Sequence, residues 1–431
     1  MQRMHSKSGS KLTTLLLGSL AAIVVVSVIL FPDQAFQSSL EGLTIWWKLV
    51  FPALLPFFIL TELLIGFGVI QGAGTLLEPL MRVLFRLPGV SGWALASGLI
   101  IGFPTGAKIT ASLREKGLIS RVESERLTAL SHLCSPLFMI MVVGVGFLHS
   151  ARLGVVLAII HYLSAILTGF LTRNKKDREI AGGTLQVQPQ GLTVTKKFET
   201  ASLWKRALYT MRNAYLHDGR AFGRMLGDAV SSSIQALMLI GGYMMIFSVI
   251  INVINITNLT EGLRFIADSL PGFMHIGIDT SPQWVKGMLE VHLGAYAFSS
   301  ADNIPLLPQM ALLSAFLGWG GLSAHAQVTG FHQKTDARYG PFLLARALHA
   351  GLAFVLTVLL WKPLEFMLKD SQPSFLWLDS AVTEQTRTVF PLYGESAWVL
   401  WGPMLSQLLL LLGAMLLISV LLQKFMSNKT Q

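Results

Sequence analysis

The chain has 431 residues, of which 52% are hydrophobic and only 13% are charged. Soluble domains carry about 25% charged residues, and the mean hydropathy here is +0.59. These values exclude a water-soluble enzyme, a disordered scaffold and a disulfide-stapled secreted domain, and they indicate a polytopic membrane protein. Cys134 is the single cysteine in the sequence, so no disulfide can form within it.

The formal net charge is +10, from 33 Lys and Arg residues against 23 Asp and Glu. The basic residues cluster in short segments beside apolar runs. Positive charge in such places sets the orientation of a membrane protein and meets anionic lipid head groups. We therefore expect the lipid bilayer as a partner, and no nucleic acid.

Eight apolar runs reach or approach the roughly 20 residues that a helix needs to cross a bilayer. They are 12–31, 43–70, 126–147, 153–171, 233–256, 309–331, 342–361 and 397–422. Run 12–31 is longer than the apolar region of a signal peptide and no small-residue cleavage site follows it, so we interpret it as an uncleaved transmembrane helix. Two further stretches, 93–112 and 285–301, are rich in Gly and interrupted by polar or charged residues.

The positive-inside rule decides how the two interrupted stretches are arranged. The N-terminal tail and segment 172–226 are both basic and should both be cytoplasmic, which requires an even number of crossings between them. Treating 93–112 and 285–301 as re-entrant hairpins meets this requirement. The predicted fold is all-α, with about eight transmembrane helices, two re-entrant hairpins and both termini cytoplasmic.

The two halves of the chain match at a nearly fixed offset. Gly106 pairs with Gly294, and His161 with His349; a further match places a helix-breaking Pro56 against Gly241. Because run 43–70 passes inward and run 233–256 passes outward, the repeat is inverted. Secondary transporters are built in this way and bind substrate near the midplane, between broken helices.

This reading divides the chain into five parts. They are the N-terminal tail and first transmembrane helix (1–40), a first repeat (41–171), a basic cytoplasmic connector (172–232), a second, inverted repeat (233–361), and an outer loop with the last helix and a short tail (362–431).

The sharpest local motif is IGFPTGAK, in the first interrupted stretch. Pro104 with Gly102 and Gly106 would break a helix and leave backbone N–H groups free to face a ligand. Lys108 and helix N-terminal dipoles would then bind a carboxylate. In the alternative, Lys108 extends to the cytoplasmic surface. The motif is not a P-loop, because Ala107 separates its second glycine from the lysine.

Glu290 is a carboxylate within the second interrupted stretch, and Glu62 is another within run 43–70. An acidic side chain inside a membrane is a candidate for proton or sodium coupling. The alternative for Glu290 is a wet hairpin tip at the outer interface. His292 either relays protons or serves packing. No HExxH or CxxC motif occurs, and no metal site is expected.

The motif GWGGLSAHAQ interrupts run 309–331. Ser323, His325 and Gln327 alternate in it, and they converge on a ligand only if the backbone is unwound there, which the glycines favour. The alternative is hydrogen bonding between helices. Since no GxSxG elbow occurs, we predict no catalytic residue and no enzyme.

The predicted site has two groups of residues. The substrate-binding residues are Gly102, Pro104, Thr105, Gly106, Lys108, Ser131, Ser135, Gly320, Gly321, Ser323, His325 and Gln327. The ion-coupling residues are Glu290 and Glu62.

Four segments carry a resemblance to a known family: FPALLPFF from Phe51, LEPLM from Leu77, GFPTGAK from Gly102 and GGLSAHAQ from Gly320. Over about residues 10–425 the chain resembles the YlbJ (SpoVV) family of sporulation integral membrane proteins. That family belongs with the nucleoside-recognition or gate-domain proteins, whose architecture is similar to that of concentrative nucleoside transporters. The two repeats, 41–171 and 233–361, would then be gate-type repeats.

The resemblance implies a function. The family moves dipicolinic acid, a planar aromatic dicarboxylate, from the mother cell across the outer forespore membrane. We therefore expect alternating access at a midplane site, a small anionic substrate, and no cofactor beyond a coupling ion, H⁺ or Na⁺. A homo-oligomer is expected by analogy with the trimeric nucleoside transporters. Two alternatives stay open: a structural protein needed for spore cortex assembly, and a transporter of a nucleoside-like solute.

Overall fold

A computed structural model describes residues 11–173, 202–256, 281–301 and 304–365, together with Gly413, Leu417, Ile418 and Leu421. Within these ranges the chain forms helices and no strands, which confirms the all-α class. Apart from the four single positions, the predicted span 397–422 lies outside the described residues. So do most of the basic connector (174–201) and most of segments 257–284 and 362–395, which the alternation of spans predicts to lie outside.

Five helices of the described ranges are long and apolar enough to cross a membrane. A helix satisfies its own backbone groups, so it is the conformation in which such segments can face hydrocarbon. The five are Pro32–Gly66, Ala151–Leu171 (α9), Phe222–Ile256 (α12), Leu306–Lys334 and Tyr339–Leu364, the last within α19 (Tyr339–Glu365). They are preceded by α1 (Lys11–Leu30).

The helix Pro32–Gly66 has three continuous parts: α2 (Pro32–Ile45), the π-helical η1 (Trp46–Val50) and α3 (Phe51–Gly66). Pro56 lies inside α3 and does not end it, so the predicted helix break at this residue is wrong. A proline removes one backbone donor, whereas ending the helix in an apolar environment would leave several groups unsatisfied.

Both interrupted stretches form helical hairpins, and their re-entrant placement in the membrane stays a prediction. In the first, α6 (Ser91–Ile100) and α7 (Thr105–Glu115) are separated by a turn with a cis peptide bond between Phe103 and Pro104. In the second, α15 (Ser281–Leu289) and α16 (Val291–Ser299) meet at Glu290. A Cβ added at Gly294 would lie 2.3 Å from the Cα of Gly287, so the two arms are folded against each other.

Two predicted spans are broken helices. Run 126–147 consists of α8 (Arg121–Ser131) and η3 (Phe138–Phe147), with a non-helical segment at 132–135. Run 309–331 consists of α17 (Leu306–Trp319) and α18 (Gly321–Phe331). At its break the φ angles of Gly320 and Gly321 are 89° and 76°, a left-handed conformation that glycine adopts readily and other residues avoid.

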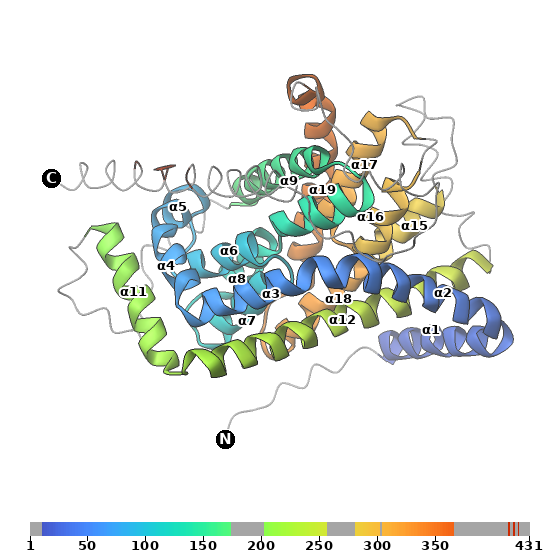
Figure 1. Cartoon of the computed structure of the whole chain (residues 1–431), viewed down its shortest axis with the longest axis horizontal. Coiled ribbons are helices and arrows are strands. Elements are labelled where there is room, and N and C mark those ends of the chain that lie inside the picture. Colours follow the sequence, from blue (N-terminus) through green and yellow to red (C-terminus); the bar gives the residue numbers. More distant parts are fainter. Residues whose placement is uncertain are drawn as a thin grey trace, which may run out of the picture.

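The long helices pack lengthwise in Figure 1, where α12 follows α2 and α3 across the molecule. Their directions are opposite, because Gly42 abuts Met244 while Gly66 abuts Met225. Further back, α19 packs against both α17 and α9. The hairpins and the broken helices lie between these long elements.

Shorter elements complete the described chain. They are α4 (Val69–Leu76), α5 (Glu78–Leu80), η2 (Met81–Phe85), α11 (Leu203–Asp218) and η5 (His332–Lys334). Helix α11 packs on α4, and its Arg206 lies 2.7 Å from the Glu78 carboxylate. Since α12 begins at Phe222, the last part of the predicted connector 172–232 belongs to that long helix.

Candidate substrate-binding site between two broken helices

The turns of the two hairpins meet the breaks of the two helices in matching ways. At the first turn, a Cβ added to Gly102 would lie 2.8 Å from the backbone nitrogen of Ser135. At the second turn, Oε1 of Glu290 lies 3.5 Å from Oγ of Ser323. Gly102 and Glu290 are 188 positions apart, as are Ser135 and Ser323. Both halves therefore place a hairpin turn on the start of the helix that follows a break.

A small pocket of about 10 Å³ lies at these turns. Three helices begin there: α7 after Pro104, α16 after Glu290 and α18 after Gly320. A helix N-terminus is equivalent to roughly half a positive charge, so three of them together favour an anion. The pocket is lined by Phe103, Pro104, Ile240, Tyr243, Glu290, Val291, His292, Ser323, Ala324 and Gln327.

Glu290 places a buried carboxyl group at this point. Its side chain is 2% exposed, its Oε2 accepts the N–H of Leu293 at 2.7 Å, and its Oε1 lies 2.8 Å from Nδ1 of His292. An ionised carboxylate only accepts hydrogen bonds, so Nδ1 then carries the proton. This burial contradicts the alternative in which Glu290 sits on a wet hairpin tip.

Four predicted site residues line the pocket: Pro104, Glu290, Ser323 and Gln327. Ser323 and Gln327 share one face of α18 because they are four residues apart in a regular helix. The predicted unwinding across 323–327 is therefore wrong. The irregular backbone is confined to Gly320 and Gly321, immediately before.

His325 turns away from the pocket and holds the break together. Its Nδ1 lies 2.8 Å from the Tyr339 hydroxyl, and its Nε2 lies 3.1 Å from the carbonyl oxygen of Trp319. The predicted convergence of His325 with Ser323 on one ligand does not occur, since the two point to different faces of α18.

Other predicted residues pack the first hairpin onto α8. A Cβ at Gly106 would lie 2.1 Å from the carbonyl oxygen of Ser131. The Ser131 hydroxyl lies 3.2 Å from that of Thr110. The Ser135 hydroxyl accepts the N–H of Phe138 at 3.1 Å, at the start of η3. None of these predicted residues lines the pocket.

Thr105, Lys108 and Glu62 also lie outside the pocket lining. Lys108 is exposed on α7, Glu62 is half-buried on α3, and neither has an ion-pair partner in the described part of the chain. The exposure of Lys108 favours the alternative in which it extends to the surface.

Arg346 of α19 is a central residue that the sequence reasoning missed. It is 1% exposed; its Nη1 donates to the carbonyl of His132 at 2.8 Å, and its Nη2 donates to that of Gly318. It thus links the ends of α8 and α17. A lone arginine within the apolar run 342–361 was the signal that could have revealed it, because charges are rare in such runs.

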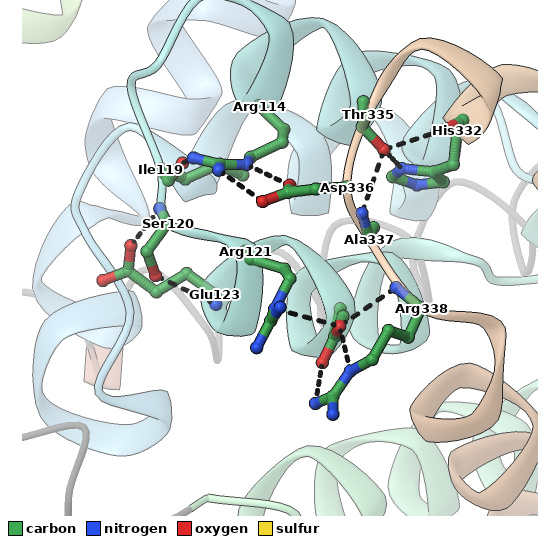
Figure 2. Close-up of polar contacts among 11 residues, drawn as sticks. Arg114, Ile119, Ser120, Arg121, Glu123, His332, Thr335, Asp336, Ala337 and Arg338 are labelled. Atoms are coloured by element: carbon green, nitrogen blue, oxygen red, sulfur yellow. Dashed lines mark hydrogen bonds and ion pairs between the residues drawn. The ribbon is translucent and has the colours of Figure 1, made fainter. Parts of the chain in front are cut away.

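A network of ion pairs ties the segment after α18 to α7 and α8 (Figure 2). Arg114 donates through Nε and Nη2 to the Asp336 carboxylate at 2.8 and 2.9 Å. Arg338 donates to Glu125 through its Nε at 2.9 Å, its Nη2 at 3.0 Å and its backbone N–H at 3.0 Å. Nearby, the Thr128 hydroxyl lies 2.8 Å from Nε2 of His332.

These ion pairs keep their carboxyl groups charged. The hydrogen bond from Arg114 lowers the pKa of Asp336. Burial raises the pKa of Glu125, but the hydrogen bonds and charge of Arg338 outweigh it and the net shift is downward. Both pairs are therefore intact at neutral pH and weaken only when acidification protonates the carboxylates. Within the described ranges, no group of three or more His, Cys, Asp or Glu could hold a metal ion.

The apolar helices, the hairpins and the buried pocket define an integral, multi-pass membrane protein. The family model described as nucleoside recognition (Gate) matches residues 47–169. The chain is 41% identical over 355 residues to the sporulation integral membrane protein YlbJ of Bacillus subtilis (strain 168). The aligned region covers 82% of this chain and 84% of that protein. The chain belongs to the YlbJ family of sporulation-associated membrane proteins. No solved structure matches it.

Proposed function

We propose that this protein transports dipicolinic acid, a small aromatic dicarboxylate, from the mother cell across the outer forespore membrane. The observation that carries the proposal is the convergence of three helix N-termini on one small pocket, which is lined by the turns of both hairpins and by the broken helix that continues as α18. Helix N-termini bind anions, and transporters with discontinuous helices direct such ends at anionic substrate groups. No catalytic residue is assigned.

Access to the pocket requires a conformational change. Ligand sites for small molecules have volumes of about 300–1,000 Å³, whereas this pocket holds about 10 Å³. The structure described here corresponds to a closed state, and alternating access would open it to one side and then the other.

An inverted repeat would supply the two matching states. Two observations support such a repeat. The contact of Gly102 with Ser135 recurs 188 positions later as the contact of Glu290 with Ser323, and α2–α3 packs antiparallel to α12. The outward and inward openings would then be related by exchanging the conformations of the two halves.

Glu290 is our candidate for ion coupling. A carboxylate that is 2% exposed and faces helix N-termini competes with an anionic substrate for the same positive ends. Protonation, or Na⁺ binding, would neutralise Glu290 and free those ends for the substrate. Glu62 is the second candidate, further from the pocket. We propose a homo-oligomer by analogy with trimeric nucleoside transporters.

Uptake of radiolabelled dipicolinate into proteoliposomes tests the proposal. Wild-type protein should take up dipicolinate in a proton or sodium gradient, and Glu290→Gln should reduce the rate at least tenfold and remove its dependence on the gradient. Glu41→Gln is the matched control, because Glu41 is an exposed carboxylate, 51% accessible, beside Lys286. It should leave uptake unchanged, and so should Lys108→Ala.

Three results would contradict the proposal in different ways. Full activity of Glu290→Gln would remove the coupling role while leaving transport intact. Absence of wild-type uptake in every gradient would favour the structural role in cortex assembly. Inhibition of uptake by nucleosides, but not by aromatic dicarboxylates, would favour a nucleoside-like substrate, the reading closest to the Gate family's description.

A further inference from the structure

A cavity of about 1100 Å³ lies where α8 meets the segment after α18. The ion pairs of Figure 2 form part of its wall. The Asp336 and Arg338 side chains are 52% and 59% exposed, so this cavity is reachable from solvent. Tyr339 and Phe342, in the first turn of α19, also line it. The cavity shares no lining residue with the Glu290 pocket.

Three aromatic rings connect this cavity to the Glu290 pocket. Phe342 lines the cavity, and its ring centroid lies 5.4 Å from that of His132, edge to face. The His132 ring in turn stacks on Phe103 at 5.3 Å. Phe103 lines the Glu290 pocket. The rings of Phe342, His132 and Phe103 therefore form a continuous layer between the two spaces, which we call the ring layer.

His132 is the polar member of the ring layer, and its two ring nitrogens make no hydrogen bond to the described residues. The side chain is 1% exposed. In His325, by contrast, both nitrogens are bonded. A buried polar group without a partner costs about 1–3 kcal/mol. A purely packing role does not require an imidazole, because an apolar aromatic ring would fill this site without that cost.

We propose that the 1100 Å³ cavity is the vestibule for the transported anion and that His132 binds it within the ring layer. When the layer opens, an aromatic dicarboxylate takes the place of a neighbouring phenyl ring against the imidazole, and one carboxylate accepts a hydrogen bond from it. This inference rests on the proposed function, which it deepens by naming a substrate-binding residue. The ion pairs around the vestibule hold its walls in the closed state.

The first test separates binding from stability. His132→Phe keeps the ring and removes the nitrogens, so it should raise the KM for dipicolinate at least tenfold while leaving the thermal stability in detergent unchanged or higher. His132→Asn restores a donor and should recover part of the affinity. A loss of stability in His132→Phe, or an unchanged KM, would overturn the assignment of His132.

The second test does not depend on transport. Cys134, the single cysteine, is 1% exposed and lies two residues from His132, so its reaction with a membrane-permeant maleimide reports opening of this region. Phe342→Ala should increase the labelling rate at least fivefold. Phe147→Ala is the matched control, since Phe147 is a buried phenyl, 3% exposed, that does not line the vestibule.

The two tests together distinguish the inference from the proposed function. Faster labelling in Phe342→Ala without any dipicolinate uptake by wild type would retain the ring layer as a barrier and reject dipicolinate as the substrate. Equal labelling in Phe342→Ala and Phe147→Ala would reject the vestibule, even if wild-type uptake is normal.

Discussion

Arg346 carries a positive charge into the core, and no carboxylate of the described residues pairs with it. Its guanidinium binds two backbone carbonyls, those of His132 and Gly318. Each carbonyl lies at the C-terminal end of a broken helix, where the dipole is equivalent to roughly half a negative charge. Two such ends balance one guanidinium, so Arg346 stabilises the breaks and leaves no net charge for a substrate.

Replacing Arg346 tests this balance. Arg346→Met should destabilise the protein by about 1–3 kcal/mol for each buried carbonyl left without a donor. Arg346→Lys should be intermediate, because an ammonium lacks the planar fork that reaches both carbonyls. Thermal unfolding in detergent measures both variants.

Arg338→Lys is the control for that series. Lysine at position 338 keeps the positive charge and the backbone N–H beside the Glu125 carboxylate, so this replacement should cost less than leaving two buried carbonyls without a donor. If Arg346→Met were as stable as Arg338→Lys, Arg346 would not stabilise the C-terminal ends of α8 and α17.

The two hairpin turns differ at one decisive residue. The first has Gly102 where the second has Glu290, 188 positions later. The first turn therefore packs its backbone directly on Ser135, while the second brings a carboxylate to Ser323. Each half supplies the same scaffold, and the acidic group comes from the second half.

At the scale of elements, the break between α17 and α18 depends on two adjacent glycines. Both have positive φ, but their surroundings differ. The nearest atom to a Cβ on Gly320 would be 3.7 Å away, in His132. A Cβ on Gly321 would lie 2.9 Å from the backbone nitrogen of Val291 and 3.1 Å from the Cα of Glu290. The first glycine is required for conformation, and the second also for the approach of the hairpin.

Alanine substitutions distinguish these two requirements. Gly320→Ala should cost about 1–2 kcal/mol, the penalty for a left-handed residue, and should leave the Glu290 hairpin in place. Gly321→Ala should cost more, because it also pushes the hairpin turn away. Unfolding temperatures and dipicolinate uptake, compared between the two variants, provide the measurement. Equal effects of the two substitutions would show that the close approach of the hairpin is not required.

At the scale of the whole molecule, helices from the two proposed repeats pack against each other. His349 of α19 lies against His161 of α9, 188 positions earlier, and its Nε2 donates to the carbonyl of His161 at 3.0 Å. The pairs Gly42–Met244 and Gly66–Met225 together show that α2–α3 and α12 run in opposite directions. Contact between equivalent residues is expected where the two parts of a repeat adjoin at a symmetry axis.

Cysteine labelling tests the orientation of the halves. In a Cys134→Ser background, single cysteines at Ser6 and Thr184 should react with an impermeant maleimide from the cytoplasmic side. A cysteine at Thr260 should react from the opposite side, because the acidic segment 257–284 is predicted to lie there. Labelling of all three from one side would reject the predicted topology.

The sequence predicted a large part of the architecture. Long apolar runs indicated α9, α12 and α19, because only a helix satisfies its backbone in hydrocarbon. The glycine and proline interruptions correctly marked both hairpins and the break at Gly320. Pro56 misled the same reasoning, because one proline inside a long apolar helix costs less than ending it.

The candidate site was predicted only in part. Glu290, Pro104, Ser323 and Gln327 were found because a carboxylate or a helix break in an apolar run is costly and therefore informative. His325 was misplaced, since the register of α18 follows from where the break ends, at Gly321. Arg346 was overlooked within an apolar run.

By itself, the sequence determined the class, the helices and the positions where they break, since each depends on local hydrophobicity and on the backbone preferences of glycine and proline. Only the tertiary structure decided which breaks meet, that three helix N-termini face one pocket, and that Arg346 joins the ends of α8 and α17. These contacts join residues far apart in the sequence, such as Arg346 and His132, which are 214 positions apart. Their geometry is set by how the helices pack, and packing depends on the whole set of side chains that fill the space between them.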